Sequence, residues 1–399
     1  MPTSDTAEVV ILGAGIAGCA LADHLARRRV GPVVVYDPRT PAAGASGRAA
    51  GIVTEQLWNA WDVAVTRESK EEYAALARQR DPSAYSVNGF ARWTVQAEAE
   101  RVLDRAVEQL HAWNVDVRRL DRDELTTRVP WGRFGDVRAA IWSPTDAVVT
   151  PSAMTEMYAE RARAAGVEFW LGVPFGKLRR SEGRWEVEAG GRTIRAPRVV
   201  VAAGAWTKRI LTEIGRPVPL APYRTQAAVL RPSPPVPEFP SVHDIDTDVY
   251  VRPESAGRIL AGDGTELVEV DPEQFRTGGD ASFETHLAES FLMRFPGWAE
   301  AELVRSWAGV CCSTPDRRPL VGPLPDAAGC CVLAGFNGFG VMRAGGVARR
   351  LAELLAAGEG DRTALELLAP VLPARFPSDL PPFAPRPGFT LEGGRDPRF

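Results

Sequence analysis

Three glycines near the N-terminus have the spacing of a nucleotide phosphate site. They belong to the stretch Gly13-Ala14-Gly15-Ile16-Ala17-Gly18, and Asp37 follows Gly18 by nineteen residues (37 minus 18). In this pattern Gly13 permits a tight turn, Gly15 lets the backbone approach a pyrophosphate, and Gly18 lets a helix pack closely on a strand. Asp37 can accept hydrogen bonds from ribose hydroxyls, and its charge disfavours a 2'-phosphate. The spacing therefore predicts a bound dinucleotide, with NADP less favoured than FAD or NAD.

The elements that must position these glycines can also be predicted from the sequence. Val9 to Leu12 is a short apolar run, a helical stretch ends near Arg29, and Val33 to Tyr36 is a second apolar run. Strand, glycine turn, helix and strand together make a βαβ unit. The fingerprint therefore stands in the structural context that it requires.

Two further glycine-rich loops and two motifs between them narrow the class of protein. The loops are Gly44 to Gly51 and Gly335 to Gly340, and the motifs are Val-Val-Ala-Ala-Gly-Ala-Trp at 200–206 and Trp-Ala-Gly, Thr-Pro-Asp and Pro-Leu-Val-Gly within 307–322. In this order they resemble the D-amino acid oxidase superfamily of flavoproteins, in particular its glycine oxidase and sarcosine oxidase branch. The resemblance extends from Val9 to about Leu355.

The resemblance implies a fold that combines α/β and α+β parts. We expect a Rossmann-like FAD-binding domain of the glutathione-reductase type and a substrate domain built on an antiparallel sheet. The FAD-binding domain is expected to be discontinuous, over 1–90, 145–220 and 300–365, with the substrate domain over 91–144 and 221–299. Residues 370–399 are rich in Pro, Gly and charge and are expected to form a surface tail. Helices are predicted between Gln96 and Val115 and from Val347 to Ala356.

The same resemblance implies which residues hold FAD. The loop from Ser46 to Gly51 would line the isoalloxazine, and the turn from Phe336 to Met342 would offer backbone amides to its pyrimidine edge, where donors stabilise the reduced flavin. Sarcosine oxidases attach flavin through a cysteine whose position here is Gly309, so non-covalent FAD is expected. The expected FAD-binding residues are Gly13, Gly15, Ile16, Ala17, Gly18, Asp37, Pro38, Arg39, Ala45, Ser46, Gly47, Arg48, Ala49, Ala50, Gly51, Phe175, Ala203, Gly204, Trp206, Gly309, Phe336, Asn337, Gly338, Phe339, Gly340, Val341 and Met342.

The family chemistry is oxidation of a carbon-nitrogen bond next to a carboxylate, with hydrolysis of the imine and reduction of O2 to H2O2. Tyr250 matches the glycine oxidase tyrosine that binds the substrate carboxylate, and strand alternation places Arg252 on the same face. The arginine that glycine oxidases carry on a later strand is replaced by Cys311, and a thiol cannot replace a guanidinium. Arg48, Arg252 and Arg343 are therefore the candidates to hold the carboxylate with Tyr250.

Several functions remain open at this stage. An oxidase acting on glycine or N-substituted glycine is favoured over a D-amino acid oxidase or dehydrogenase. A flavin dehydrogenase of the same fold with another electron acceptor differs only in its reactivity with oxygen. An NAD-dependent dehydrogenase is disfavoured by the C-terminal glycine-rich loop, and a non-catalytic flavin module has only the missing arginine in its favour. The Ala- and Arg-rich composition is typical of genomes in which relatives also serve biosynthetic pathways.

Composition excludes other classes of protein. The 399 residues include 47 basic and 51 acidic side chains, a balance that argues against nucleic acid as a partner. Four histidines without ligand spacing and five cysteines without a CxxC pair predict no metal site. No apolar stretch reaches the length of a membrane span, and the first residues lack the basic segment of a secretion signal, so a cytoplasmic protein is expected. Small-molecule amine or amino acid and O2 are the expected partners, and the oligomeric state is left open.

Overall fold

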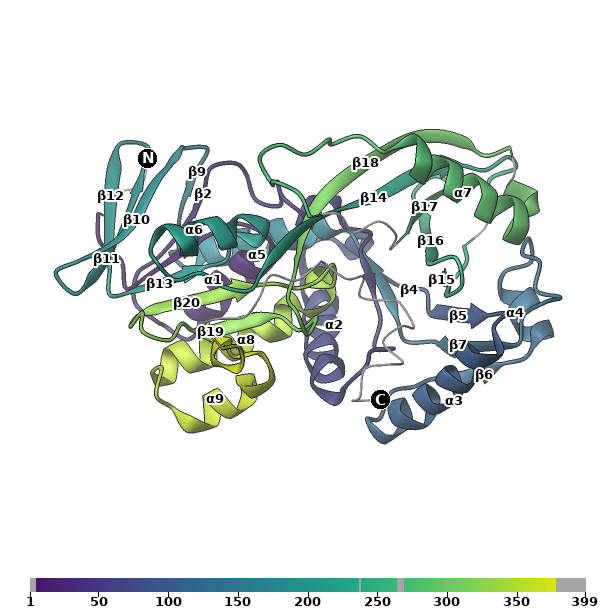
Figure 1. The fold of residues 1–399 in the computed structure, drawn as a ribbon, viewed down its shortest axis with the longest axis horizontal. Helices are drawn as coiled ribbons and strands as arrows, with labels where there is room; N and C mark the ends of the chain where they lie inside the picture. The colour runs from purple at the N-terminus through teal and green to yellow at the C-terminus, as the bar shows by residue number, and fades with distance from the viewer. Residues whose placement is uncertain (1–4, 237, 264–268, 299, 378–399) are drawn as a thin grey trace.

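The computed structural model describes residues 5–236, 238–263, 269–298 and 300–377. Two sheets organise this part of the chain, one in each half of the molecule (Figure 1). The long strands β14 (Ala221–Arg231) and β18 (Glu302–Ser313) run between the halves. The expected combination of a Rossmann-like sheet and a largely antiparallel sheet is confirmed.

The first sheet has six strands in the order β19-β20-β13-β1-β2-β9, and all neighbours except β19 and β20 are parallel. Its central strands β1 and β2 are buried on both faces, as their continuous Val-rich runs predict. In chain order they are β1 Val9–Leu12, β2 Val33–Asp37, β9 Glu168–Leu171, β13 Arg198–Val201, β19 Leu320–Pro323 and β20 Cys330–Ala334.

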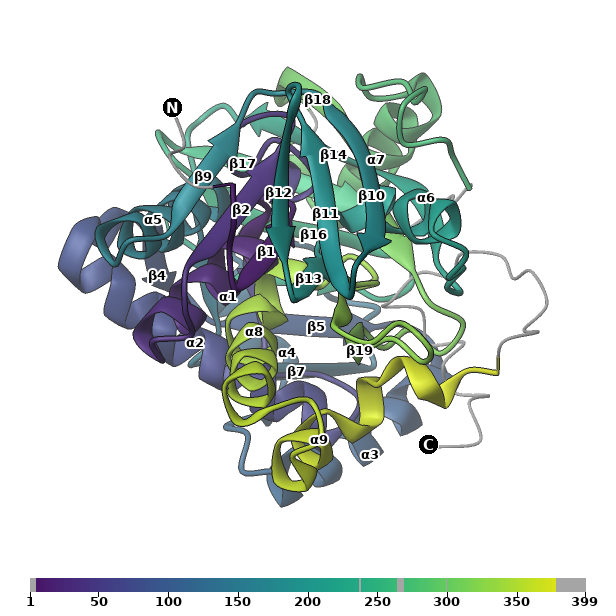
Figure 2. The same ribbon diagram turned by 90° about the vertical axis from the view of Figure 1, so that its left-hand side faces the viewer.

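Helices cover one face of the six-stranded sheet, and a small sheet covers the other. The helices share one hydrophobic core with Val9, Ile11 and Val35, whereas the small sheet shares a second core with Val10, Leu12 and Val34. Figure 2 shows the small sheet, β10-β11-β12, facing the viewer beside β1 and β2. The covering elements are α1 Ile16–Arg27, α2 Ala60–Arg80, α5 Pro151–Ala164 and α8 Gly340–Ala357, and β10 Phe175–Ser181, β11 Arg184–Ala189, β12 Arg192–Ala196 and α6 Thr207–Glu213.

The second sheet has eight strands in the order β18-β14-β17-β16-β15-β5-β7-β6, antiparallel except for the β15–β5 pair. Its inner residues alternate with period two, so Val249 and Val251 pack under α7 (Ala281–Arg294) while Tyr250 faces the other way. Its remaining strands are β5 Phe90–Thr94, β6 Arg118–Leu120, β7 Ala139–Ser143, β15 Ser241–Asp244, β16 Val249–Glu254 and β17 Arg258–Asp263.

The remaining helices and a three-stranded sheet lie beside the two larger sheets. The predicted amphipathic helix is α3, with Leu103 and Leu110 buried. The bounds of these elements are α3 Ala97–Ala112, α4 Arg122–Arg128, α9 Arg362–Leu368, and β3 Ile52–Val53, β4 Tyr85–Val87 and β8 Ala147–Val149, which form a three-stranded sheet.

The structure differs from the predicted organisation at three places. β18 belongs to the eight-stranded sheet although residues from 300 onward were assigned to the FAD-binding part, because β18 pairs along its length with β14. α8 begins at Gly340 rather than near Val347, so Gly346 lies inside the helix. Glycine is required at this position because a Cβ there would lie 2.3 Å from the carbonyl oxygen of Val65 on α2. The predicted surface tail, 370–399, contains the buried Val371 near its start, and its residues 378–399 lie outside the described part.

Candidate active site

A cavity of about 770 Å³ lies between the carboxyl ends of the parallel strands and one face of the eight-stranded sheet. It is lined by the fingerprint loop, the loop after β2, the start of α8 and the strands β14, β16 and β18. Ligands of open α/β sheets bind at the carboxyl ends of the strands. The cavity therefore joins the predicted nucleotide site to the predicted substrate sheet.

The fingerprint loop has the geometry that its three glycines predict. Gly13 has φ +121°, and a Cβ on Gly18 would lie 2.0 Å from the carbonyl oxygen of Gly13, so both positions exclude side chains. A Cβ on Gly15 would meet only the Ser46 hydroxyl, at 3.3 Å, and Gly15 lines the cavity. Asp37 accepts hydrogen bonds from the amides of Ala14 at 2.8 Å and Arg39 at 2.9 Å, which fixes the carboxylate at the cavity wall.

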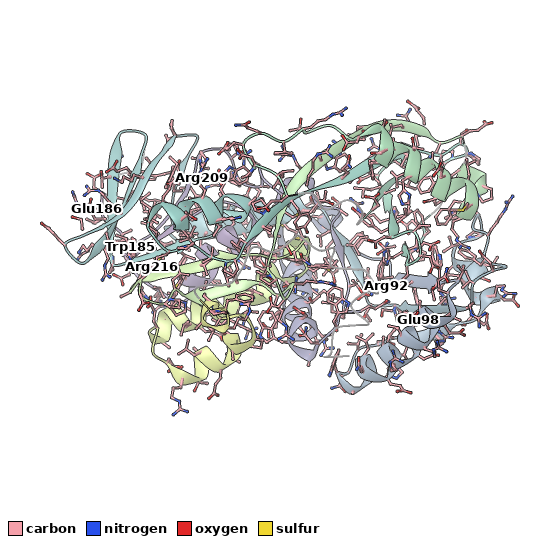
Figure 3. The ribbon with its side chains drawn as sticks, viewed as in Figure 1. Arg92, Glu98, Trp185, Glu186, Arg209 and Arg216 are labelled. Atoms are coloured by element: carbon pink, nitrogen blue, oxygen red, sulfur yellow. The ribbon has the colours of Figure 1, made fainter. Side chains whose placement is uncertain are left out.

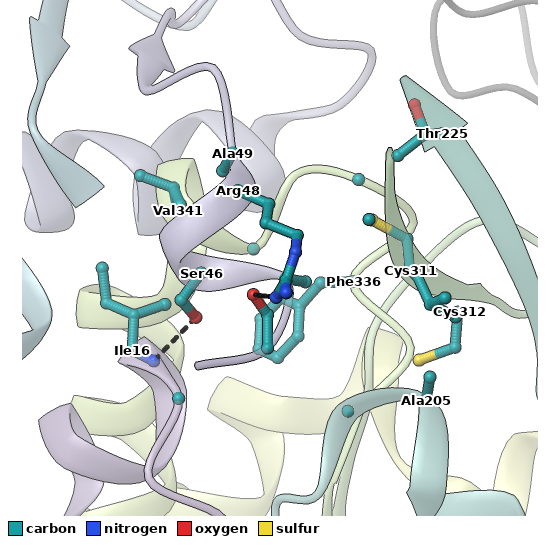
Figure 4. Close-up of a pocket in the computed structure, with 18 of the residues that line it drawn as sticks. Ile16, Ser46, Arg48, Ala49, Ala205, Thr225, Cys311, Cys312, Phe336 and Val341 are labelled. Atoms are coloured by element: carbon teal, nitrogen blue, oxygen red, sulfur yellow. Dashed lines mark hydrogen bonds between the residues drawn. The ribbon is translucent and has the colours of Figure 1, made fainter. Parts of the chain in front are cut away.

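Two helices begin at the cavity. The amide of Ile16 at the start of α1 donates to the Ser46 hydroxyl at 3.0 Å, as Figure 4 shows. α8 begins at Gly340, and no side chain caps its first amides. Helix N-termini carry partial positive charge and free amides, so both are suited to anionic or carbonyl groups of a ligand.

The turn before α8 contains a buried side chain that lacks partners. Asn337 is 2% exposed, has φ +52° and lines the cavity, and its backbone amide donates to the carbonyl of Cys312 at 3.0 Å. Neither its Oδ1 nor its Nδ2 has a hydrogen-bond partner within the described structure. A buried amide without partners is costly, and the turn that holds it is part of the cavity lining.

Of the three candidate arginines, Arg48 lines the cavity and the other two do not. Arg48 lines the cavity, packs over Gly309 and donates to the carbonyls of Ala43 and, at 3.1 Å, of Gly44 in its own loop. Figure 4 shows it reaching between the start of α1 and the strand that carries Cys311. The Arg48 side chain is therefore held partly by backbone carbonyls of the loop that carries it.

The other two arginines do not line the cavity. Arg252 donates to the carbonyl of Ala50 and pairs with Glu254 at 3.0 Å. Arg343 is fully buried, pairs with Asp62, and donates to the carbonyl of Phe336 at 2.9 Å. Both guanidinium groups therefore bind the backbone of loops that line the cavity, without lining it themselves.

Most predicted FAD-binding residues line the cavity, and two do not. Gly18 packs against the fingerprint turn, and a Cβ on Gly47 would lie 2.4 Å from the carbonyl oxygen of Ala42, so both shape the loops without facing the cavity. The predicted residues that line it are Gly13, Gly15, Ile16, Ala17, Asp37, Pro38, Arg39, Ala45, Ser46, Arg48, Ala49, Ala50, Gly51, Phe175, Ala203, Gly204, Trp206, Gly309, Phe336, Asn337, Gly338, Phe339, Gly340, Val341 and Met342.

The sheet side of the cavity carries Tyr250 and several polar residues that sequence reasoning missed. Tyr223 and Thr225 on β14 lie opposite Cys311 and Gly309 of β18, and His243 on β15 lies opposite Tyr250. His243 Nε2 lies 2.9 Å from Asp248 Oδ1. Period-two alternation along β14 was the signal that could have found Tyr223 and Thr225, but the prolines around β14 obscured the strand.

Burial raises the pKa of two tyrosines and one cysteine on this side. Burial, followed by the charge of Asp263, raises the pKa of Tyr250 above its ordinary value. Burial, followed by the charge of Cys311, also raises the pKa of Tyr223. Burial raises the pKa of the Cys311 thiol to about 11, against a hydrogen bond from Tyr223 that lowers it. The two tyrosines and the thiol are therefore uncharged hydrogen-bonding groups at neutral pH.

One cluster outside the cavity brings metal-ligand types together although none was predicted. Ligand atoms of Asp23, His24 and Glu72 lie within 4.8 Å of one another. Arg161 donates to both Asp23 carboxylate oxygens and, at 2.9 Å, to Glu72, while His24 and Tyr158 also bond to Glu72. The carboxylates thus already have cationic partners, and the cluster acts as an ion-paired contact among α1, α2 and α5.

The fold and the site define an FAD-dependent oxidoreductase. A model of the FAD dependent oxidoreductase family DAO matches residues 8–354, so the chain belongs to that family and FAD is its cofactor. The predicted membership in the D-amino acid oxidase superfamily is thereby confirmed.

Individual curated relatives of the chain include enzymes named for the oxidation of glycine and dimethylglycine. It is 27% identical to mitochondrial dimethylglycine dehydrogenase of Rattus norvegicus over 385 residues, which cover 91% of this chain and 44% of that protein. It is 25% identical to glycine oxidase of Geobacillus kaustophilus, with 84% and 89% covered. The chain thus spans less than half the length of the dimethylglycine dehydrogenases that it matches.

Solved structures share the fold. L-proline dehydrogenase from P. horikoshii has a TM-score of 0.84 at 24% identity, covering 90% of this chain and 96% of that one. Glycine oxidase from Geobacillus kaustophilus has a TM-score of 0.82 at 23% identity, covering 94% and 100%. Within the described residues, no helix is long and apolar enough to cross a membrane.

Proposed function

We propose that this flavoenzyme oxidises the carbon-nitrogen bond of glycine or an N-substituted glycine to an imine, which water hydrolyses, while O2 is reduced to H2O2. The observation that carries the proposal is the continuity of one cavity from the fingerprint loop to Tyr250 and the polar face of the eight-stranded sheet. Relatives described as dimethylglycine dehydrogenase and glycine oxidase support an amino acid substrate with an unsubstituted or methylated amine.

The residues present fit FAD. Gly15 leaves open space against the start of α1, Asp37 stands at the end of β2, and the start of α8 and Asn337 offer unpaired polar groups. We assign the diphosphate and ribose to the first two and the isoalloxazine to the α8 end, held without a covalent bond. When bound, FAD would supply the acceptor for the hydride that leaves the carbon next to the substrate nitrogen.

In this proposal the protein's own side chains orient the substrate. The Tyr250 hydroxyl keeps its proton, so it donates a hydrogen bond to the carboxyl end of the substrate. The apolar rings of Phe336 and Phe339 exclude water from the cavity wall. Holding the reacting carbon still against the cofactor is the contribution that such a site makes to the rate.

Two alternatives remain and share the same site. A dehydrogenase would use an electron acceptor other than O2, as the printed names of several relatives suggest for those proteins. A D-amino acid substrate would place a side chain on the reacting carbon. A cytoplasmic location and a biosynthetic role remain predictions from the sequence.

Anaerobic reduction of the bound flavin tests the proposal. Glycine, N-methylglycine, N,N-dimethylglycine and D-alanine are mixed in turn with the holoenzyme, and bleaching of the flavin absorbance is followed before and after O2 is admitted. Reduction by a glycine-type substrate with production of H2O2 supports the oxidase. Rapid reduction with slow reoxidation by O2 favours the dehydrogenase, and no reduction by any of them refutes the proposal.

Replacement of Tyr250 tests the substrate assignment. Tyr250→Phe should keep FAD and lower the efficiency of reduction about tenfold, since one donor to the carboxyl end is lost. Tyr85→Phe is the matched control, because Tyr85 lies on β4 outside the cavity. Equal efficiencies for the two variants would contradict a role for Tyr250 in substrate binding.

A further inference from the structure

One row of paired residues crosses the cavity face of the eight-stranded sheet and contains Tyr250. Each member lies opposite the next on neighbouring strands, so all their side chains start from the same face of the sheet. The row begins on β5, in the half of the molecule where Figure 3 labels Arg92, and ends on β18, the last strand of the sheet. In order across the sheet it consists of Arg92, His243, Tyr250, Gly262, Ala227 and Trp307.

The two neighbours of Tyr250 in this row differ in size. On β15, the His243 ring fills its position, and its Nε2 lies 2.9 Å from Asp248 Oδ1. On β17, Gly262 has no side chain, and a Cβ there would lie 2.2 Å from the Tyr250 hydroxyl oxygen and 2.4 Å from the ring carbon that carries it. The Tyr250 ring therefore lies over Gly262, and its hydroxyl ends on the β17 side, next to β14.

The backbone at Gly262 does not itself require glycine. Its φ is not positive, and it lies inside β17, where glycine weakens a strand. The three atoms nearest to a Cβ at this position are the two atoms of the Tyr250 phenol and, at 2.9 Å, the carbonyl oxygen of Gln226. Glycine at this position therefore serves the close approach of the phenol and of β14.

The next member of the row is small and lines the cavity. Ala227 lies about 5 Å from Gly262, one strand spacing away, and Trp307 lies at the same spacing on its other side. Ala50, from the loop that is predicted to line the isoalloxazine, packs against the same hydrophobic cluster as Ala227, and so do Tyr250 and Trp307. Ala227 is thus a small residue between two aromatic side chains, beside the predicted flavin loop.

We propose that Gly262 is a positioning residue of the substrate site, which leaves room for the Tyr250 ring over β17 and so aims the Tyr250 hydroxyl at the carboxyl end of a substrate seated above Ala227. The inference rests on the proposed function and assigns that end of the substrate to one place on the sheet. Trp307 and Ala50 border this place, which suits a group as small as a carboxylate.

The distances set the size of the expected effect. Ordinary contact of a Cβ begins at about 3.4 Å, so a methyl group on Gly262 displaces the Tyr250 hydroxyl by at least about 1.2 Å (3.4 minus 2.2). A misplacement of about 1 Å can cost about a hundredfold in rate. We expect Gly262→Ala to keep FAD and to lower the efficiency of anaerobic flavin reduction at least tenfold, measured with the most efficient of glycine, N-methylglycine and N,N-dimethylglycine.

Gly135→Ala is the matched control. A Cβ on Gly135 meets nothing within 4 Å, its φ is not positive, and it lies outside the cavity. Its efficiency of reduction should stay within twofold of that of the original enzyme.

A second background separates the phenol from the backbone. Gly262→Ala also brings a methyl group against the carbonyl of Gln226, which disturbs β14 whether or not Tyr250 is present. In Tyr250→Ala the ring is absent, so adding Gly262→Ala to that variant should change the efficiency of reduction by less than twofold. An equal loss in both backgrounds would show that Gly262 acts through β14 and would overturn the positioning role.

Acetate tests the same place without any oxidation. It is titrated against the oxidised holoenzyme, and the change in flavin absorption gives its Kd. We expect the Kd to rise at least fivefold in Gly262→Ala and to stay within twofold in Gly135→Ala. Ala227→Val fills the proposed seat with a residue that suits a strand, so it should raise the Kd at least fivefold as well. Unchanged acetate binding in Gly262→Ala and Ala227→Val, or no effect of acetate on the original enzyme, would overturn the seat above Ala227.

The inference and the proposed function fail in different ways. Reduction of the original enzyme by a glycine-type amine, with unchanged efficiency in Gly262→Ala, overturns the inference and leaves the proposed oxidation intact. Acetate binding that depends on Gly262 and Ala227, with no reduction by any of the amines, refutes the proposed oxidation and keeps the carboxyl site. If Gly262→Ala loses FAD, Ala227→Val provides the deciding measurement, and an unchanged efficiency in that variant would overturn the inference.

Discussion

Gly15→Ala separates ligand binding from folding at the fingerprint loop. Gly15 has φ −70°, which alanine adopts without strain, and its Cβ would meet only the Ser46 hydroxyl at 3.3 Å. The neighbouring Gly18 is different, because a Cβ there would lie 2.0 Å from a backbone oxygen that cannot move away. The Gly15→Ala variant is therefore expected to fold normally, whereas a variant with alanine at Gly18 is not.

The magnitudes follow from these distances. In the apoprotein, Gly15→Ala should cost up to about 1 kcal/mol, since alanine is a poorer residue than glycine at a helix start. The new methyl group points into the cavity, where the diphosphate must approach the backbone, and we expect a rise in the Kd for FAD of about a hundredfold or more. With FAD at 100 times the original Kd, the ligand stabilises the original protein by about 2.7 kcal/mol and the variant by only about 0.4 kcal/mol.

The assay measures FAD binding and unfolding on the same samples. Quenching of flavin fluorescence gives the Kd, and thermal unfolding with and without FAD gives the stabilisation by the ligand. Gly360→Ala is the control, because a Cβ there meets nothing within 4 Å and φ is not positive. A Kd for Gly15→Ala within threefold of the original value would refute the assignment of the diphosphate to this loop.

Three further predictions concern the cofactor bond, the ion pair behind the cavity and stability in acid. FAD should stay in the supernatant after acid precipitation, since Gly309 offers no side chain for attachment; yellow pellets would contradict this. Arg343→Met should destabilise the fold by about 3–5 kcal/mol because Asp62 is left charged and buried, and adding Asp62→Asn should recover part of the loss in urea unfolding. Burial alone would raise the pKa of Glu72, but its interactions with His24, Tyr158 and Arg161 outweigh burial and lower this pKa to about 2. The ionised Glu72 therefore stabilises the fold by about 3 kcal/mol at any pH above its unfolded pKa of 4.5. This stabilisation is lost as the pH falls from 4.5 towards 2. The stability difference between the original protein and Glu72→Gln should shrink over that range, and a constant difference from pH 6 to pH 2.5 would contradict this linkage.

The local sequence pattern was sufficient to predict the nucleotide-binding loop of the protein. The turn at Gly13, the packing of Gly18 and the position of Asp37 all depend on residues within one βαβ unit, so their spacing along the chain fixes their spacing in space. Alternation along one strand likewise placed Tyr250 and Arg252 on one face of β16.

The structure alone decided which polar groups meet in the cavity. Arg252 and Arg343 were candidates because the strand of Tyr250 and the glycine-rich turn that precedes Arg343 were predicted near the site. In the structure their guanidinium groups bind the Ala50 carbonyl and the Asp62 carboxylate, which are far away in the sequence. Glycines interrupted the predicted start of α8, and only the close approach of Val65 explains why Gly346 belongs inside the helix.

The sheet side of the cavity shows the physical reason for this division. Tyr223 meets Cys311 because β14 and β18 pair over their length, although 88 residues (311 minus 223) separate the two positions in the chain. His243 meets Tyr250 by the register of β15 and β16, and a shift of one residue would turn each side chain to the opposite face. Periodicity within a strand gives the face of each side chain, whereas the partner across the sheet depends on register and strand order. The sequence by itself therefore determined the flavin-binding class of this protein, and only the tertiary structure decided which neutral and charged groups line its cavity.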